Sequence, residues 1–127
     1  MRLILVRHAE AAAGDPDDLR PLTPAGRDAA RELAARLAPE APEAVLSSPL
    51  LRARETAAAI AEAAGLEAQA DERLAPGATA DDVRGAAAGR GETVVAVGHQ
   101  PDCSEIVLAL TGREVRFRPG GYCEVEL

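Results

Sequence analysis

Short apolar runs alternate with helical patterns along most of this chain. Residues 3–6 (LILV) and 94–97 (VVAV) are uninterrupted apolar runs, which is typical of strands buried on both faces of a sheet. Apolar residues also recur at helical spacing in residues 24–37 and again from 49 to about 64. The alternation predicts an α/β fold, a three-layer α/β/α arrangement with a mainly parallel sheet.

Local signals mark where the first two helices begin and end. Thr23 followed by Pro24 is typical of a helix N-cap and a first helical residue. The same pattern at Ser48-Pro49 predicts the start of a second helix, and Gly65 is a typical residue to end it. A short strand over residues 44–46 separates the two helices.

The rest of the chain is predicted in less detail. A capping-box pattern predicts a short helix near residues 81–88. After a strand over residues 93–97, Pro101 opens a last helix that ends at Gly112. The tail alternates polar and apolar residues over 114–118 and 122–127, which predicts a hairpin or two edge strands. We therefore expect an antiparallel edge strand near the C-terminus.

Length and charge limit the class of protein. The chain has 127 residues, enough for one hydrophobic core but not for two, so we expect residues 1–127 to form a single domain. The net charge of −7, without a basic stripe, argues against nucleic acid as a partner. Because no apolar stretch is long enough for a membrane span or a signal peptide, we expect a cytoplasmic protein that does not bind membranes. We also expect a monomer.

Arginine and histidine side chains follow the predicted strands. Arg7 and His8 end the first strand, and His99 follows the strand over residues 93–97. Arg52 lies in the first turns of the second helix, whereas Arg54 should face solvent. Since the carboxyl ends of parallel strands meet at one edge of a sheet, these loops should form one pocket. Two arginines, two histidines and helix N-termini suit a phosphoryl group.

The residue types also indicate a reaction. A neutral imidazole can attack phosphorus and form a phosphohistidine, which divides one difficult displacement into two easier ones. The arginines and the other histidine would then hold the phosphoryl oxygens. No metal-binding cluster or Walker motif is visible, and Cys103 and Cys123 do not form a CxxC pair. We expect a reaction without metal or cofactor, and reduced, structural cysteines.

Three segments occur in the order of known signatures. The segments RHAE (7–10), SPLLRARET (48–56) and GHQP (98–101) resemble those of the histidine phosphatase, or phosphoglycerate-mutase-like, superfamily. The segment LRPLTPAG (19–26) resembles the SixA branch of phosphohistidine phosphatases. The resemblance covers about residues 1–112. It implies a single histidine phosphatase domain, with His8 as the nucleophile and a phosphate pocket completed by Arg7, Arg52 and His99. Gln100 and Arg20 are further candidates for substrate binding.

Two departures from the family pattern bear on the substrate. Ala9 replaces the glycine that often follows the catalytic histidine, and its small methyl group should be tolerated. Family members that cleave phosphoesters usually have an acidic proton donor after the leucine that corresponds to Leu74, whereas this chain has Ala75-Pro76-Gly77 there. An alkoxide leaving group needs that proton, whereas an imidazole, with a pKa of about 6.5, can leave with little help. We therefore expect a phosphohistidine protein domain as substrate, although Glu10, Asp71 or Glu72 could replace the missing acid.

Several residues have two possible roles, and the protein itself has alternative functions. Arg20 could line the pocket or pair with Asp17 or Asp18, and the latter is favoured. Gln100 could contact phosphate through its backbone N–H or cap the last helix. Ser48 is favoured as a helix cap rather than a catalyst. A broad-specificity phosphomonoesterase is the alternative enzyme, and a non-catalytic phosphoprotein-binding module is the alternative of another class.

Overall fold

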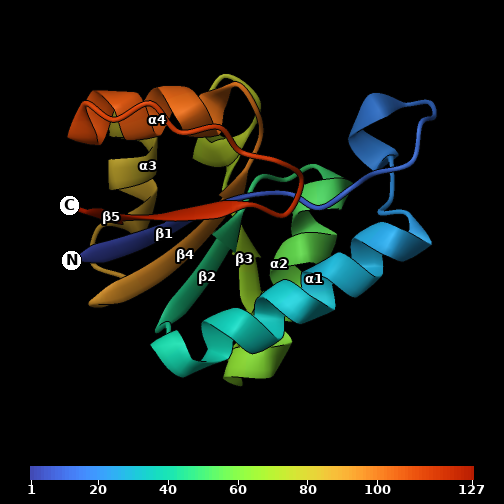
Figure 1. Cartoon of the computed structure of the whole chain (residues 1–127), viewed down its shortest axis with the longest axis horizontal. Helices are drawn as coiled ribbons and strands as arrows, with labels where there is room; N and C mark the ends of the chain where they lie inside the picture. The colour runs from blue at the N-terminus through green and yellow to red at the C-terminus, as the bar shows by residue number, and fades with distance from the viewer.

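A five-stranded sheet in the order β3-β2-β4-β1-β5 forms the centre of the protein (Figure 1). The computed structural model describes all 127 residues. The strands are β1 (Arg2–Arg7), β2 (Ala44–Ser47), β3 (Ala68–Ala70), β4 (Thr93–Gly98) and β5 (Tyr122–Glu126). The first four are parallel, whereas β5 pairs antiparallel with β1 at the edge of the sheet. The predicted fold class and its antiparallel edge strand are confirmed.

Helices cover both faces of this sheet. They are α1 (Pro24–Leu37), α2 (Leu51–Ala64), α3 (Ala80–Ala87) and α4 (Asp102–Thr111), with 3₁₀ turns η1 (Asp17–Leu19), η2 (Ala38–Glu40) and η3 (Glu72–Leu74). Helices α1 and α2 lie on one face, and α3 and α4 lie on the other (Figure 1). This is the predicted three-layer arrangement. None of these helices has the length and apolar character needed to cross a bilayer.

Strand β1 shows why uninterrupted apolar runs form the sheet. Leu3 and Leu5 face the core beneath α3 and α4, whereas Ile4 and Val6 face the core beneath α1 and α2. All four side chains are at most 1% exposed. Since successive side chains of a strand point to opposite faces, only a run that is apolar at every position can fill both cores.

The predicted helix signals at three positions are confirmed. Thr23 caps α1, because its hydroxyl oxygen accepts from the backbone N–H of Gly26 at 2.9 Å. Thr79 and Asp82 form the capping box of α3. Gly65 ends α2 in the left-handed conformation, with φ of 73°, which glycine adopts without steric cost.

Three local predictions are wrong or incomplete. Helix α2 begins at Leu51, not at Ser48-Pro49, because the N–H of Ser48 continues the ladder of β2 by donating to Val97 at 2.9 Å. Residues 114–118 form no strand, since Phe117 turns into the core and is 5% exposed. Strand β3 is not predicted; Ala68 is partly buried, and the other two of its three residues are exposed.

The strand register brings the candidate residues together. Arg7 at the end of β1 is paired with Gly98 at the end of β4, so His8 and His99 follow at neighbouring positions. Ser47 of β2 is paired with Val97 of β4, which places Ser48 beside the same two strand ends. The parallel sheet therefore delivers three polar side chains to one edge, as open α/β sheets commonly do.

Candidate active site

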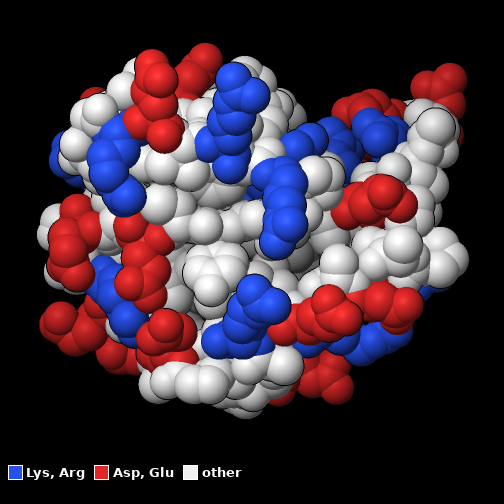
Figure 2. Space-filling view, viewed as in Figure 1, with Lys and Arg blue, Asp and Glu red and all other residues white.

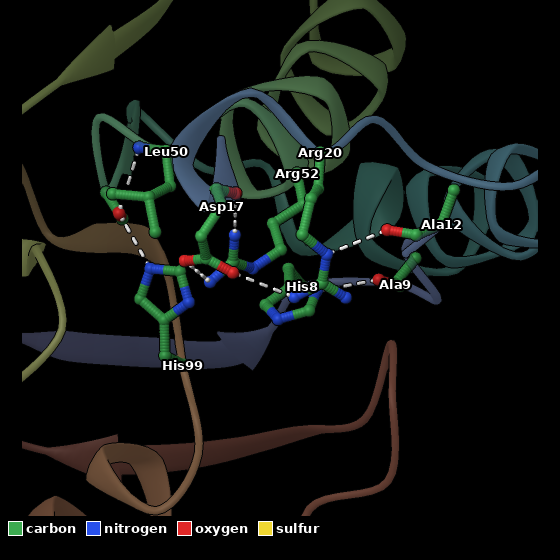
Figure 3. A network of polar contacts seen from close by, with 9 residues as sticks. His8, Ala9, Ala12, Asp17, Arg20, Leu50, Arg52 and His99 are labelled. Atoms are coloured by element: carbon green, nitrogen blue, oxygen red, sulfur yellow. Dashed lines mark hydrogen bonds and ion pairs between the residues drawn. The ribbon is translucent and has the colours of Figure 1, made fainter. Parts of the chain in front are cut away.

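His8, Arg52 and His99 meet at the carboxyl edge of the sheet, as the sequence predicts (Figure 3), and Arg7 lies close enough for its charge to act on His8. The ring centroids of the two histidines lie 5.3 Å apart, with the ring planes tilted by 60°. Arg52 reaches them from the first turn of α2 and is only 7% exposed. The site therefore combines two imidazoles with guanidinium groups that cannot lose their charge.

The His8 ring is held in one tautomer. Its Nδ1 lies 2.7 Å from the carbonyl oxygen of Ala9. Because a carbonyl oxygen only accepts, Nδ1 must carry the proton, and a neutral ring then has a lone pair on Nε2. Burial lowers the pKa of His8, and the charges of Arg52 and Arg7 lower it further, although the bond to Ala9 opposes this. His8 is thus a neutral imidazole at pH 7, the form that can attack phosphorus.

His99 directs Nδ1 toward the centre of the site, and its Nε2 points away, toward Ser48 (Figure 3). Its Nε2 lies 2.7 Å from Oγ of Ser48. That hydroxyl oxygen also accepts from the N–H of Leu50 at 3.2 Å, and its own proton is available for donation to Nε2. Nδ1 of His99 then carries a proton; it is buried without a hydrogen-bond partner and faces the centre of the site (Figure 3). Burial and the charges of His8 and Arg52 lower the pKa of His99 to about 4.

Asp17 from η1 bridges two arginines of the site. Its backbone carbonyl accepts from Nη1 of Arg52 at 2.9 Å, and its Oδ2 lies 3.3 Å from Nη2. Arg20 donates to Oδ1 at 3.0 Å and to the carbonyl of Ala12 at 2.7 Å. In Figure 3 the carboxylate lies between the two histidines. The hydrogen bond from Arg20 and the charge of Arg52 hold the pKa of Asp17 below its usual value.

The sequence interpretation of Arg20 and Asp17 is therefore incomplete. Arg20 pairs with Asp17, as favoured, but its charge also acts on His8. Acidic residues in a polar loop such as residues 14–21 are usually solvated. Asp17 does expose 66% of its side chain, yet its carboxylate contacts two guanidiniums that face His8. Contacts of this kind depend on the loop conformation, which composition alone does not indicate.

Two further residues of α2 fix the position of the loop after β1. Thr56, which is fully buried, accepts from the N–H of Ala9 at 3.0 Å and donates to the carbonyl of Arg52 at 2.9 Å. Glu55 accepts from the N–H of Leu22 at 2.7 Å. Thr56 lies four residues after Arg52 and thus on the same helix face, a spacing that could have identified it. Its hydroxyl connects the helix that carries Arg52 to the residue after His8.

The loop after His8 is also packed tightly. The methyl group of Ala9 is fully buried against Leu22 and Ala30, so the loop has space for this side chain. A methyl group on Gly26 would overlap the backbone carbonyl of Glu10. Only glycine therefore allows the first turn of α1 to approach this loop so closely.

Other predicted residues lie outside this cluster. The side chain of Gln100 caps α4, because its Oε1 accepts from the N–H of Ser104 at 3.0 Å. Arg54 is exposed, as expected. Among the substitute acids, Glu72 is exposed and Glu10 accepts from Thr23 at 2.7 Å. The third, Asp71, is hydrogen-bonded to Arg73 at 2.8 Å, which lowers its pKa.

The two histidines should titrate at separate pH values, both below the usual value of about 6.5. We expect a midpoint of about 4 for His99, while the midpoint of His8 is lowered by burial and by the neighbouring guanidiniums. Because the chain has only two histidines, NMR of the ring C–H signals across pH resolves both, and a His8→Asn variant assigns them. A midpoint for His8 at or above 6.5 would contradict a neutral nucleophile.

A comparison of the sequence with protein families identifies the chain's relatives. The profile of the histidine phosphatase superfamily, branch 1, matches residues 3–76. The chain belongs to the histidine phosphatase superfamily. The match includes the first two signatures, with Arg7, His8 and Arg52, and membership implies a phosphatase. No curated protein sequence matches the chain.

Solved structures of this superfamily share the fold. The protein histidine phosphatase SixA, complexed with tungstate, has a TM-score of 0.88 and 27% identity, with 100% of this chain and 88% of that chain covered. A protein from Agrobacterium tumefaciens described as a phosphohistidine phosphatase, SixA, has a TM-score of 0.82 and 28% identity, with 97% and 89% covered. A mycobacterial glucosyl-3-phosphoglycerate phosphatase shows the same fold, with a TM-score of 0.74, 20% identity, and 97% and 88% covered.

Proposed function

We propose that this protein is a phosphohistidine phosphatase that acts on a phosphorylated histidine of another protein. In the first step, Nε2 of His8 attacks phosphorus; the new N–P bond forms as the bond to the substrate imidazole breaks, and that imidazole leaves neutral with a proton on its other ring nitrogen. In the second step, water attacks the phosphorus of phospho-His8; the new O–P bond forms as the His8 N–P bond breaks, the His8 imidazole is the leaving group, and the protons of the water stay with the released phosphate. Neither step requires an electron donor or acceptor, and each is a displacement at phosphorus.

The other site residues would stabilise the transferring group. Arg7 donates one N–H to the carbonyl of Phe117 at 2.9 Å, while its buried Nε has no partner. Together with Arg52 and Nδ1–H of His99, it offers donors to the phosphoryl oxygens. Donors fixed in place before the reaction stabilise the charge of the transition state without reorganisation.

The observation that carries the choice of substrate is the pairing of Asp17, an acid whose charge acts on His99, with Arg20 and Arg52. Asp17 is the carboxylate that contacts the arginines of the site, and its lowered pKa keeps it ionised at neutral pH. An ionised carboxylate cannot donate the proton that an alkoxide leaving group needs. A substrate imidazole, with a conjugate acid of pKa about 6.5, needs little help to leave. The site therefore favours cleavage of a P–N bond over that of an alkyl P–O bond.

The comparisons support the same proposal. Two of the similar structures are described as SixA phosphohistidine phosphatases, at 27% and 28% identity. The first of these is complexed with tungstate, a tetrahedral oxyanion like phosphate. The matched segment of this chain includes the arginine and histidine of the first signature.

A panel of substrates with different leaving groups tests the proposal. We expect kcat/KM for a phosphohistidine peptide to exceed that for phosphoserine and 3-phosphoglycerate by at least about 100-fold, the usual contribution of a general acid. p-Nitrophenyl phosphate, whose leaving group needs no proton, should be cleaved faster than phenyl phosphate. Similar rates on phosphohistidine and alkyl phosphates would instead support the phosphomonoesterase. Binding without phosphate release would support the non-catalytic module.

Asp17 should compete with the substrate phosphate for Arg20 and Arg52. We expect Asp17→Asn to lower the inhibition constant of inorganic phosphate by about two- to fivefold, a small effect because exposed ion pairs are weak. The matched control is Asp18→Asn, which removes the adjacent, exposed carboxylate. Weaker phosphate inhibition in Asp17→Asn would show that Asp17 positions the arginines rather than competing.

A further inference from the structure

An open groove lies beside the active site, between α1 and the segment before β5. Its volume is about 730 Å³. We call it the arginine groove; it is lined by Ala29, Glu32, Leu33 and Arg36 of α1 and by residues 116–122. Figure 2 shows a hollow on this face with basic side chains around it, and all basic side chains of this chain are arginines.

The charge of the arginine groove differs from that of the whole molecule. Arg36, Arg116 and Arg118 are exposed and form no ion pair or side-chain hydrogen bond. Glu32 is the one acidic residue of the lining. By contrast, Arg2, 20, 31, 52 and 73 all form ion pairs. A chain with a net charge of −7 therefore keeps three uncompensated cations together around one concave surface.

The lining also has the composition of a protein interface. Tyr122 in the groove is one of three large hydrophobic residues that remain exposed, at 41%. Tyrosine and arginine are the residue types enriched at the centres of protein interfaces and among their energetic hot spots. The concave shape and this composition favour a protein surface over a flat polyanion such as a nucleic acid.

Backbone hydrogen bonds connect the groove directly to the nucleophile. The N–H of Gly120 donates to the carbonyls of Arg7 and His8, both at 3.1 Å, and the N–H of Arg7 donates to Gly121 at 2.9 Å. The guanidinium of Arg7 donates to the carbonyl of Phe117 at 2.9 Å. One wall of the groove is thus bonded to the strand end that carries His8, and a partner bound there is adjacent to the catalytic residues.

We propose that the arginine groove docks an acidic surface of the protein substrate, next to its phosphorylated histidine. This inference rests on the proposed function. The catalytic residues would bind only the phosphoryl group, and the arginine groove would bind the protein surface around it. Carboxylates of the partner would pair with Arg36, Arg116 and Arg118, and an apolar side chain would pack on Tyr122. Complementary charge of this kind speeds association and selects partners.

Charge reversal in the groove provides the test. The test variant combines Arg116→Glu with Arg118→Glu, and the matched control combines Arg54→Glu with Arg84→Glu, two exposed arginines outside the groove. Both variants change the net charge equally. The probes are two fluorescent 15-residue helical peptides that contain one histidine and either four Glu or four Gln residues, each unphosphorylated and phosphorylated.

We expect the wild-type protein to bind the unphosphorylated Glu peptide more tightly than the Gln peptide. The groove variant should weaken binding of the Glu peptide by roughly tenfold, whereas the control should not. The preference in kcat/KM for the phosphorylated Glu peptide should disappear in the same variant, with turnover of free phosphohistidine unchanged. Equal binding by the groove variant and the wild type would overturn the inference, as would equally tight, groove-dependent binding of an oligonucleotide of the same charge.

The two proposals fail in different ways. Groove-dependent peptide binding without phosphate release from any phosphohistidine would overturn the proposed function and leave the docking surface in place. Phosphate release that ignores both the peptide charge and the groove variant would leave the function in place and overturn the docking surface.

Discussion

Replacing His8 with alanine is expected to lower kcat/KM on a phosphohistidine peptide by at least about 1,000-fold, the order of loss seen when a covalent nucleophile is removed. The hydrogen bond from Nδ1 to Ala9 leaves Nε2 as the lone pair, and the lowered pKa keeps the ring neutral. His99 cannot replace it, because its Nε2 is engaged with Ser48. Steady-state phosphate release measures the loss.

The same variant should still bind phosphate. Arg7, Arg52 and His99 remain in place in His8→Ala, so calorimetry with inorganic phosphate should give a dissociation constant within about tenfold of the wild-type value. A His8→Asn variant, closer in size to histidine, controls for a local collapse of the site. Retained turnover in either variant would mean that the nucleophile is misassigned.

Replacing Arg52 with methionine is expected to lower kcat/KM by about 100- to 1,000-fold, the range for a fixed donor that stabilises a transition state. Arg52 is 7% exposed and acts electrostatically on both His8 and His99. Its loss removes a buried positive charge from the position where the phosphoryl oxygens would bind. The pKa of each histidine should rise as well, because the charge of Arg52 lowers both.

Arg54→Met is the matched control for this loss. Arg54 lies on the same helix two residues away but is exposed and makes no side-chain contact with the site. Phosphate release should be within about twofold of the wild-type rate in this variant, because isolated surface substitutions have small effects. Equal losses in the two variants would indicate that α2 as a whole, rather than the Arg52 guanidinium, had been disturbed.

Much of the sheet and the four central side chains could be predicted from the sequence. The apolar runs that become β1 and β4 are long enough to identify, and Arg7, His8 and His99 follow them directly. Parallel strands then place these residues at one edge whatever the details of the loops. Arg52 was predicted because the start of a helix after a strand lies at the same edge.

Interactions that depend on distant partners could not be predicted. Ser48-Pro49 has a local helix-start pattern, but its hydroxyl bonds His99, 51 residues away, and the helix begins later. Asp17 is one of several acids in a loop, and only the fold of η1 turns it toward Arg52. Residues 114–118 alternate as a strand would, but Phe117 is buried in the core and the segment forms no strand, whereas residues 122–126 form the predicted edge strand β5. In each case a long-range contact outweighed a local preference.

Direct trapping of the phosphorylated enzyme tests the central claim, that His8 takes a phosphoryl group from another histidine. The protein is mixed with a ³²P-phosphohistidine peptide, quenched in alkali within milliseconds, digested and mapped by mass spectrometry. The account predicts label on His8 that is stable to alkali and lost in acid, and no label in His8→Asn. Phosphate release with no labelled enzyme, or label on any residue other than His8, would contradict it.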